Sequence, residues 1–458
     1  MQERQTLSPT RINDDLLRFV LRAPPRWFWL AAAALGLLVG AGVVSEGLLI
    51  VFGLQLMGLN NPQFWATFIA NFIFWVGISH AGVMISAILR LTQAEWRRPI
   101  TRSAEVLAIF ALVTASIFPL IHTGRIWRTI YWVFPYDFTR NLWPNVRSAL
   151  IWDPSAIVTY LTGTLLFVYV DLIPDLAALR DRTDGWRRRI YGALALGFRG
   201  TRRQWRLQLV ASTLLSALIL PVFVSVHSIV GWDLSMAILP GWHTTVMAPY
   251  FVIGAVHSGV AGVVMTMAAL RRLLHLDAYI TAAHFDTLGR LQIVVALAYL
   301  FFFLMDFYFG LFSREPVEVR IWELRLLIPP TNVLFFIQVL TALLIPLPLW
   351  FSRRVRRSPS LMFWAALSVN VGMWLERYIL VVTPVSFKQP FVFTWVTTYQ
   401  PGLVEYVITA ASFALVALGI LVFAKVLPIV PLWDVKEGQV LKQDVPVGRT
   451  NVPGVFRE

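Results

Sequence analysis

The chain contains no cysteine among its 458 residues. It can therefore form no disulfide bond, no thiolate-ligated iron–sulfur cluster and no thioether-linked haem. A redox cofactor held by this chain would need histidine ligands, and otherwise it would belong to a partner protein. Sequence patterns for a phosphate-binding loop, a zinc site or a hydrolase triad are also absent, so we expect no metal site.

Charged residues are scarce as well, at 14% of the chain against about 25% in soluble domains. Hydrophobic residues make up 57% of the chain, and the mean hydropathy is +0.67. This is the composition of an integral membrane protein. The net charge of +14 would suggest nucleic acid for a soluble protein, but here the arginines lie in short connections between apolar segments, where they set topology. We expect the lipid bilayer, and not nucleic acid, as the surrounding partner.

Ten apolar segments are long enough to cross a bilayer, which takes about 20 residues. The sequence therefore predicts an all-α integral membrane protein, with spans near 27–58, 62–91, 103–123, 154–179, 206–231, 246–270, 291–312, 326–351, 360–382 and 403–427.

The distribution of lysine and arginine tests this number of spans independently. If both termini lie inside, the inner segments hold 30 of the 39 Lys and Arg residues and the outer segments hold 8. If one span were added or missed, every later connecting segment would change sides, and the difference in Lys and Arg between the two sides would be lost. The asymmetry therefore predicts ten spans with both termini inside, which for a protein of a bacterial inner membrane is the cytoplasmic side.

Two spans share a short motif. Gly77-x-x-His80-x-Gly82 in the second span is echoed by Gly254-x-x-His257-x-Gly259 in the sixth. This spacing predicts two related four-helix bundles, although small residues recur wherever membrane helices pack closely. The expected division is an N-terminal arm (1–26), a flanking helix (27–58), a first bundle (62–231), a second bundle (246–382), a flanking helix (403–427) and an extended C-terminal arm (428–458).

The stretch from Phe118 to Pro154 places a histidine and a carboxylate at the outer edge of the membrane. His122 ends the third span, and Asp153-Pro154 opens the fourth, where proline is tolerated in the first turn. A quinol needs a base for its hydroxyl protons and apolar walls for its ring and tail. We therefore interpret His122 and Asp153 as catalytic residues of a quinol site. The alternative is a salt bridge with a nearby arginine that only orders the loop.

Three further residues are candidates for binding the quinol at this edge. Arg125 follows His122 by three residues and so lies near the same helical face. Asp233 lies at the outer end of the fifth span, and Asn71 lies roughly 13 Å into the second.

Ionisable residues deeper in the spans suggest a path for protons. Asp171 lies roughly 27 Å beyond Asp153 along one helix, so the fourth span carries a carboxylate near each face. The full set predicted for this path is Asp171, His80, His257, Glu105 and Asp306. Structural ion pairs are the alternative. For His80 and His257, a further alternative is that they ligate a haem.

The arrangement of the FPLIHTGR, IWDPSA, HAGV and HSGV segments on ten spans resembles the NrfD/PsrC family of polysulfide reductase-type membrane subunits. Within it, the chain is most similar to the larger NrfD-like subunit of bacterial alternative complex III. The resemblance covers residues 27 to 430. It implies a subunit without a covalently held cofactor that oxidises menaquinol near the periplasmic face, with quinol-site roles for His122, Asp153, Asp233 and Arg125.

The resemblance also implies partners: a periplasmic iron–sulfur subunit, multihaem cytochrome c subunits, a second NrfD-like subunit and small membrane subunits. Three alternatives stay open from the residues themselves, one of which is a purely structural anchor with no site. A secondary transporter would show Gly- or Pro-broken helices that meet at mid-membrane. A cytochrome b-like anchor would ligate haem through buried histidines.

Overall fold

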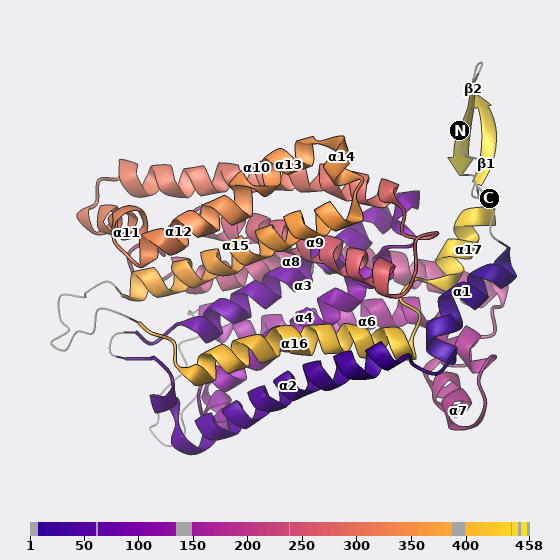
Figure 1. Ribbon diagram of the computed structural model, residues 1–458, viewed down its shortest axis with the longest axis horizontal. Helices are drawn as coiled ribbons and strands as arrows, with labels where there is room; N and C mark the ends of the chain where they lie inside the picture. The colour runs from indigo at the N-terminus through magenta and orange to yellow at the C-terminus, as the bar shows by residue number, and fades with distance from the viewer. Residues whose placement is uncertain are drawn as a thin grey trace.

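The computed structural model describes residues 8–60, 63–133, 149–237, 239–386, 399–440, 442–447 and 450–455. The described chain is an elongated bundle whose long helices run side by side along its longest axis (Figure 1). Ten helices in these ranges are long and apolar enough to cross a membrane. The prediction of an all-α protein with ten spans is therefore confirmed.

The ten spans begin and end within about five residues of the predicted limits, except that the first ends six residues earlier and the seventh begins nine residues earlier. They are α2 (Arg26–Phe52), α3 (Thr67–Leu91), α4 (Thr101–His122), α6 (Asp153–Arg180), α8 (Arg202–Ser235), α9 (Met247–Leu273), α10 (Ala282–Phe312), the composite α12–η5–α13 (Thr331–Phe351), α15 (Pro359–Val385) and α16 (Leu403–Val426).

Local sequence signals fix several of these limits. Pro154 stands in the first turn of α6, where its missing N–H is not needed. Thr201 and Gln204 form a capping box at the start of α8. Gly53 ends α2 with φ of 79°, a conformation that favours glycine.

Shorter elements connect and cover the spans. They are α1 (Pro9–Leu21), α5 (Ile130–Val133), α7 (Gly185–Leu194), α11 (Pro316–Leu327), α14 (Arg353–Arg356), α17 (Leu432–Val440) and an antiparallel hairpin of β1 (Lys442–Val447) and β2 (Thr450–Val455). Both chain termini lie at one end of the bundle together with α1, α7 and α17, and α11 lies at the other (Figure 1). We call these the terminal end and the distal end.

The two helices that share the glycine–histidine motif, α3 and α9, pack against each other at the centre of the molecule. A Cβ atom on Gly259 of α9 would collide with the Cβ of Ala81 in α3, and one on Gly82 would collide with the backbone of Ala104 in α4. The motif glycines therefore allow close helix approach. The first and last spans, α2 and α16, pack on each other along one side of the bundle (Figure 1).

The C-terminal segment differs from the extended arm that its polar sequence predicts. Residues Leu432–Val440 form helix α17, which packs against α1 and α6 of the same chain. Asp434 is buried and accepts hydrogen bonds from Arg97 at 2.8 Å and from Arg98 at 3.3 Å. An internal ion pair, which periodicity cannot reveal, holds this segment on the bundle.

Candidate functional site

A pocket at the distal end brings together three of the predicted site residues. It lies between α3, α4, α6 and α8, and has an empty volume of about 760 Å³. His122 reaches it from the last turn of α4, Asp153 from the first turn of α6 and Asp233 from the last turn of α8. Helix ends from the first bundle thus assemble the site, as the positions of these residues in the sequence predict.

The polar groups of this pocket are only partly satisfied by the protein. Asp153 is 4% exposed and shares a side-chain hydrogen bond with Asp233. A hydrogen bond between two carboxyl groups requires that one of them carries a proton. The Nδ1 of His122 and one oxygen of each carboxyl group have no hydrogen-bond partner among the described residues. The pocket therefore offers a base and a proton-sharing acid pair to a ligand.

Apolar side chains form the remaining walls of this pocket, and the sequence interpretation did not single them out. They are Trp65, Ile69, Phe72, Ile73, Pro119, Leu150, Val230 and Leu234. The aromatic residues Trp75 and Trp127 lie elsewhere: Trp75 donates a hydrogen bond to Ser412 at 3.0 Å, and Trp127 is 61% exposed. The three α3 residues follow the i, i+3, i+4 spacing of one helical face, which is a signal that could have identified them.

Two predicted quinol-binding residues do not line the pocket. Arg125 is exposed in the turn after α4, beyond Gly124. Asn71 is fully buried on another face of α3, where it donates to Thr409 at 2.8 Å and accepts from Trp374 at 2.7 Å. Helix α3 begins at Thr67, so Asn71 lies four residues, or roughly 6 Å, into the helix and not the predicted 13 Å. Depth alone also does not say which neighbour a helical residue faces. Asn71 joins α3 to α15 and α16.

His80 lies in the interior of the first bundle, in contact with the aromatic side chains of Tyr160, Phe223 and His227. Its ring stacks on Tyr160 with centroids 4.5 Å apart, and the ring of His227 lies 4.8 Å away. The His80 Nε2 and both ring nitrogens of His227 have no hydrogen-bond partner among the described residues. His227 lies eight residues before the end of α8, and its side chain is fully buried against His80.

Helix α6 carries polar side chains along one face from the pocket to the terminal end. Tyr160, Thr164 and Asp171 follow Asp153 by 7, 11 and 18 residues, which are close to two, three and five turns of an α-helix. All four side chains are buried. This face links the pocket, the His80 contact and the carboxylate at the opposite end of the helix.

Asp171 and Glu105 belong to a buried ionic cluster near the terminal end. Asp171 pairs with Arg90 and accepts a hydrogen bond from Ser212 at 2.6 Å. Arg102 lies 3.4 Å from Glu105 and 3.1 Å from a third carboxylate, that of Asp175. The cluster thus combines three carboxyl groups, Asp171, Glu105 and Asp175, with two guanidinium groups, Arg90 and Arg102.

The other two residues of the predicted path, His257 and Asp306, lie in the second bundle. His257 is hydrogen-bonded through one ring nitrogen to the Ala342 carbonyl at 3.1 Å and through the other to Gln292 at 2.9 Å. Asp306 pairs with Arg325 at 3.5 Å. With both nitrogens engaged, His257 has none free for iron, which argues against the bis-histidine haem alternative.

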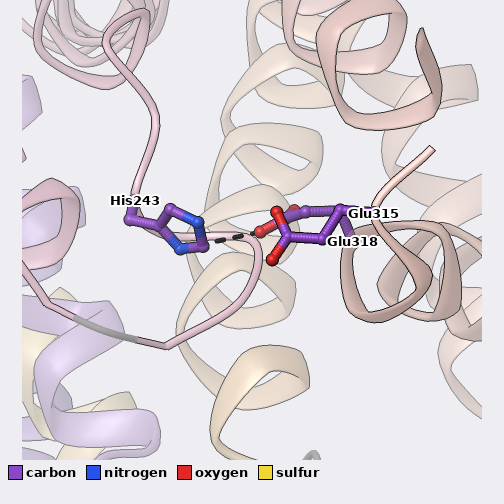
Figure 2. Close-up of side chains that lie close together, drawn as sticks. All are labelled: His243, Glu315 and Glu318. Atoms are coloured by element: carbon purple, nitrogen blue, oxygen red, sulfur yellow. Dashed lines mark ion pairs between the residues drawn. The ribbon is translucent and has the colours of Figure 1, made fainter. Parts of the chain in front are cut away.

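His243, which the sequence places near Asp233, instead faces α11 at the distal surface. Its ring lies beside the carboxylates of Glu315 and Glu318 (Figure 2). Three such side chains could hold a metal ion, but two of them, His243 and Glu318, are already engaged by contacts within the protein. The His243 Nδ1 lies 3.0 Å from the Leu239 carbonyl, and Glu318 accepts a hydrogen bond from the Gly241 N–H at 2.8 Å.

Comparison with known proteins agrees with this architecture. A family model described as "Polysulphide reductase, NrfD" matches residues 55–387. A putative dimethyl sulfoxide reductase membrane subunit of Halobacterium salinarum is 25% identical over 53% of this chain, and the chain spans 51% of that relative's length. A selenate reductase subunit of Mesobacillus selenatarsenatis is 22% identical over 86% of this chain and 92% of its own.

The family match includes eight of the ten described spans in full, and it contains His122, Asp153 and Asp233. Both relatives are named as subunits of reductases. The chain therefore belongs to the polysulphide reductase NrfD family of multi-pass membrane proteins.

Proposed function

We propose that this chain is a quinol-oxidising membrane subunit of an electron-transfer complex. The observation that carries the proposal is the distal pocket, in which the unpartnered His122 nitrogen and the Asp153–Asp233 pair face apolar walls. A quinol hydroxyl can donate to these groups while its ring and tail occupy the apolar space. A secondary transporter is less well supported, because only one of the ten described spans is interrupted, at Leu340–Leu344.

Oxidation of a quinol releases two protons and two electrons. In the proposed reaction His122 accepts one proton, and the ionised member of the Asp153–Asp233 pair accepts the other. The electrons leave one at a time to a partner, since the chain has no cysteine to hold an iron–sulfur cluster. We expect the partner that accepts these electrons to be a peripheral iron–sulfur subunit bound at the distal end.

The finer assignments follow from the sequence resemblance. They are menaquinol as the substrate, the larger NrfD-like position in bacterial alternative complex III, and multihaem cytochrome c, a second NrfD-like subunit and small membrane subunits as partners. The excess of Lys and Arg near the terminal end supports a cytoplasmic location for both termini, in an inner membrane. The distal pocket would then lie on the periplasmic side.

Proton translocation coupled to this reaction is part of the proposal. The Asp153–Tyr160–Asp171 face of α6 and the His80–His227 contact support a route between the pocket and the ionic cluster. In the second bundle, the ring of His257 stacks on Tyr299, whose hydroxyl oxygen lies 3.3 Å from that of Tyr250. These contacts are the support for a separate proton route through His257 and Asp306.

The decisive experiment compares the purified complex with its His122→Ala variant. We expect menaquinol-dependent reduction of a cytochrome acceptor to fall by about 10²- to 10⁴-fold, the usual contribution of a general base. The matched control is His275→Ala, which removes a histidine from a turn at the terminal end. Unchanged turnover in His122→Ala, with the complex intact, would reject the proposed site.

A further inference from the structure

A second pocket lies on another side of α4, between α2, α4 and α16. Its empty volume is about 620 Å³, close to that of the first pocket. Ile117, Phe118 and Ile121 of α4 line it, whereas Pro119 and His122 of the same helix line the first. Two pockets of similar size thus flank the distal half of one helix.

Two polar side chains with unpartnered oxygen atoms, Glu46 and Thr114, line this mainly apolar pocket. Both carboxyl oxygens of Glu46, from α2, are covered and have no hydrogen-bond partner among the described residues. The same holds for the hydroxyl of Thr114, from α4, whose side chain is 2% exposed. Unpartnered polar groups inside a membrane are costly, so these groups point to a ligand that supplies hydrogen bonds.

The charge and depth of the pocket restrict the class of this ligand. Among the described residues, no lysine or arginine lines it, and its one ionisable group is the acid Glu46, so a phosphate headgroup would be repelled. Glu46 lies six residues before the end of α2, roughly 9 Å below the distal end. Val43 and Ile117 at its rim are 67% and 38% exposed on the apolar flank of the bundle. The fitting ligand is a neutral, lipid-soluble molecule with a hydroxyl group.

We propose that this pocket is a second binding site for a quinol. Glu46 accepts a hydrogen bond from one quinol hydroxyl group, and the hydroxyl of Thr114 forms a hydrogen bond with an oxygen on the quinol ring. The choice of a quinol among hydroxyl-bearing lipids rests on the proposed function. The second site holds a quinol beside the oxidising pocket, on another side of α4. Its lining offers one carboxyl group and no histidine, a single acceptor for a reaction that releases two protons, so the role proposed for it is binding without oxidation.

Photoaffinity labelling of the purified complex with an azidoquinone tests this proposal. Labels on residues 39–46 of α2 or 408–415 of α16 report the second pocket, and labels on α6 or α8 report the first. We expect both sets, each suppressed by excess unlabelled menaquinone. Glu46→Leu and Thr114→Val should each reduce the α2 and α16 labels about tenfold, the effect of one lost hydrogen bond, and should leave the α6 and α8 labels unchanged.

The control is Ser116→Ala, which removes a hydroxyl bound to the Leu112 carbonyl of its own helix. If Glu46→Leu does not fold, Thr114→Val gives the same answer alone. Labels on α2 that resist competition, or that neither variant reduces, would mean that only lipid chains fill the pocket. Labels confined to α6 and α8 would overturn the second site and leave the proposed function standing. Labels confined to α2 and α16 would overturn the proposed function and leave the second site standing. If excess menaquinone suppresses no label at either pocket, both proposals are overturned.

Discussion

Asp153 and Asp233 are both carboxylic acids, yet they share a hydrogen bond at the distal pocket. A hydrogen bond between two carboxyl groups needs one proton, so at most one member of the pair is ionised. A quinol releases its two protons in separate steps. A carboxyl pair that takes up one proton, next to a histidine that takes up another, can accept the two protons one after the other.

Asn71 provides a test of which buried polar residues serve binding and which serve structure. Asn71→Ala removes hydrogen bonds to Thr409 and Trp374 but changes no residue that lines the distal pocket. We expect thermal stability to fall by about 1 kcal/mol, with the KM for quinol unchanged. Thermal unfolding and steady-state kinetics measure the two effects. A raised KM with unchanged stability would restore Asn71 to the quinol site.

Single residues at helix ends could be predicted from the sequence better than residues in helix interiors. His122 and Asp153 are fixed at the edge of the membrane by the limits of their spans, so few neighbours are available to them. Asn71 and His227 lie inside their spans, where the rotation of the helix decides the contact. Hydropathy gives depth but does not fix rotation when a helix such as α3 is buried on nearly all sides.

At the scale of elements, the contact between α3 and α9 unites the two halves of the chain. Its closest point is Gly259, where any side chain would meet Ala81 and the α3 backbone at Ile78 and Gly77. The repeated motif indicated related helices, and the structure shows that they are packed on each other. Apolar packing also holds α2 and α16, but no motif in the sequence announced that pair.

Gly259→Val should weaken this contact. Overpacking of a close interface costs about 1–3 kcal/mol, and here the obstacle includes backbone atoms that cannot move aside. The matched control is Gly40→Ala in α2, which has open space around its added methyl group and should be neutral or slightly stabilising. Thermal unfolding in detergent measures both. Equal stability of the two variants would show that α3 and α9 separate easily.

At the scale of the whole molecule, the polar residues divide into a distal site for chemistry and a terminal cluster of ion pairs. In this cluster Asp171 pairs with Arg90, and Arg102 lies between Glu105 and Asp175. The sequence predicted two members of this cluster, but the pairing of α4 with α6 needed the fold.

Asp171→Asn should separate proton movement from electron transfer. Asparagine retains hydrogen bonding to Arg90 and Ser212 but cannot exchange a proton. Alanine is less suitable, because it would also remove the hydrogen bonds to Arg90 and Ser212. We expect fewer protons translocated per electron in vesicles and unchanged quinol oxidation. The control is Asp181→Asn, in an exposed pair with Arg180. Equal loss of both activities, or of neither, would reject a separate path.

The pairing of α2 with α16 sets an order for biogenesis. About 350 residues separate the end of one helix from the start of the other, and at 5–20 residues per second their synthesis takes roughly 20–70 s. During that time the newly inserted first helix has only lipid, or an insertion chaperone, against the surface that its partner will cover. Closure of the bundle must therefore wait for the ribosome to finish the last membrane segment.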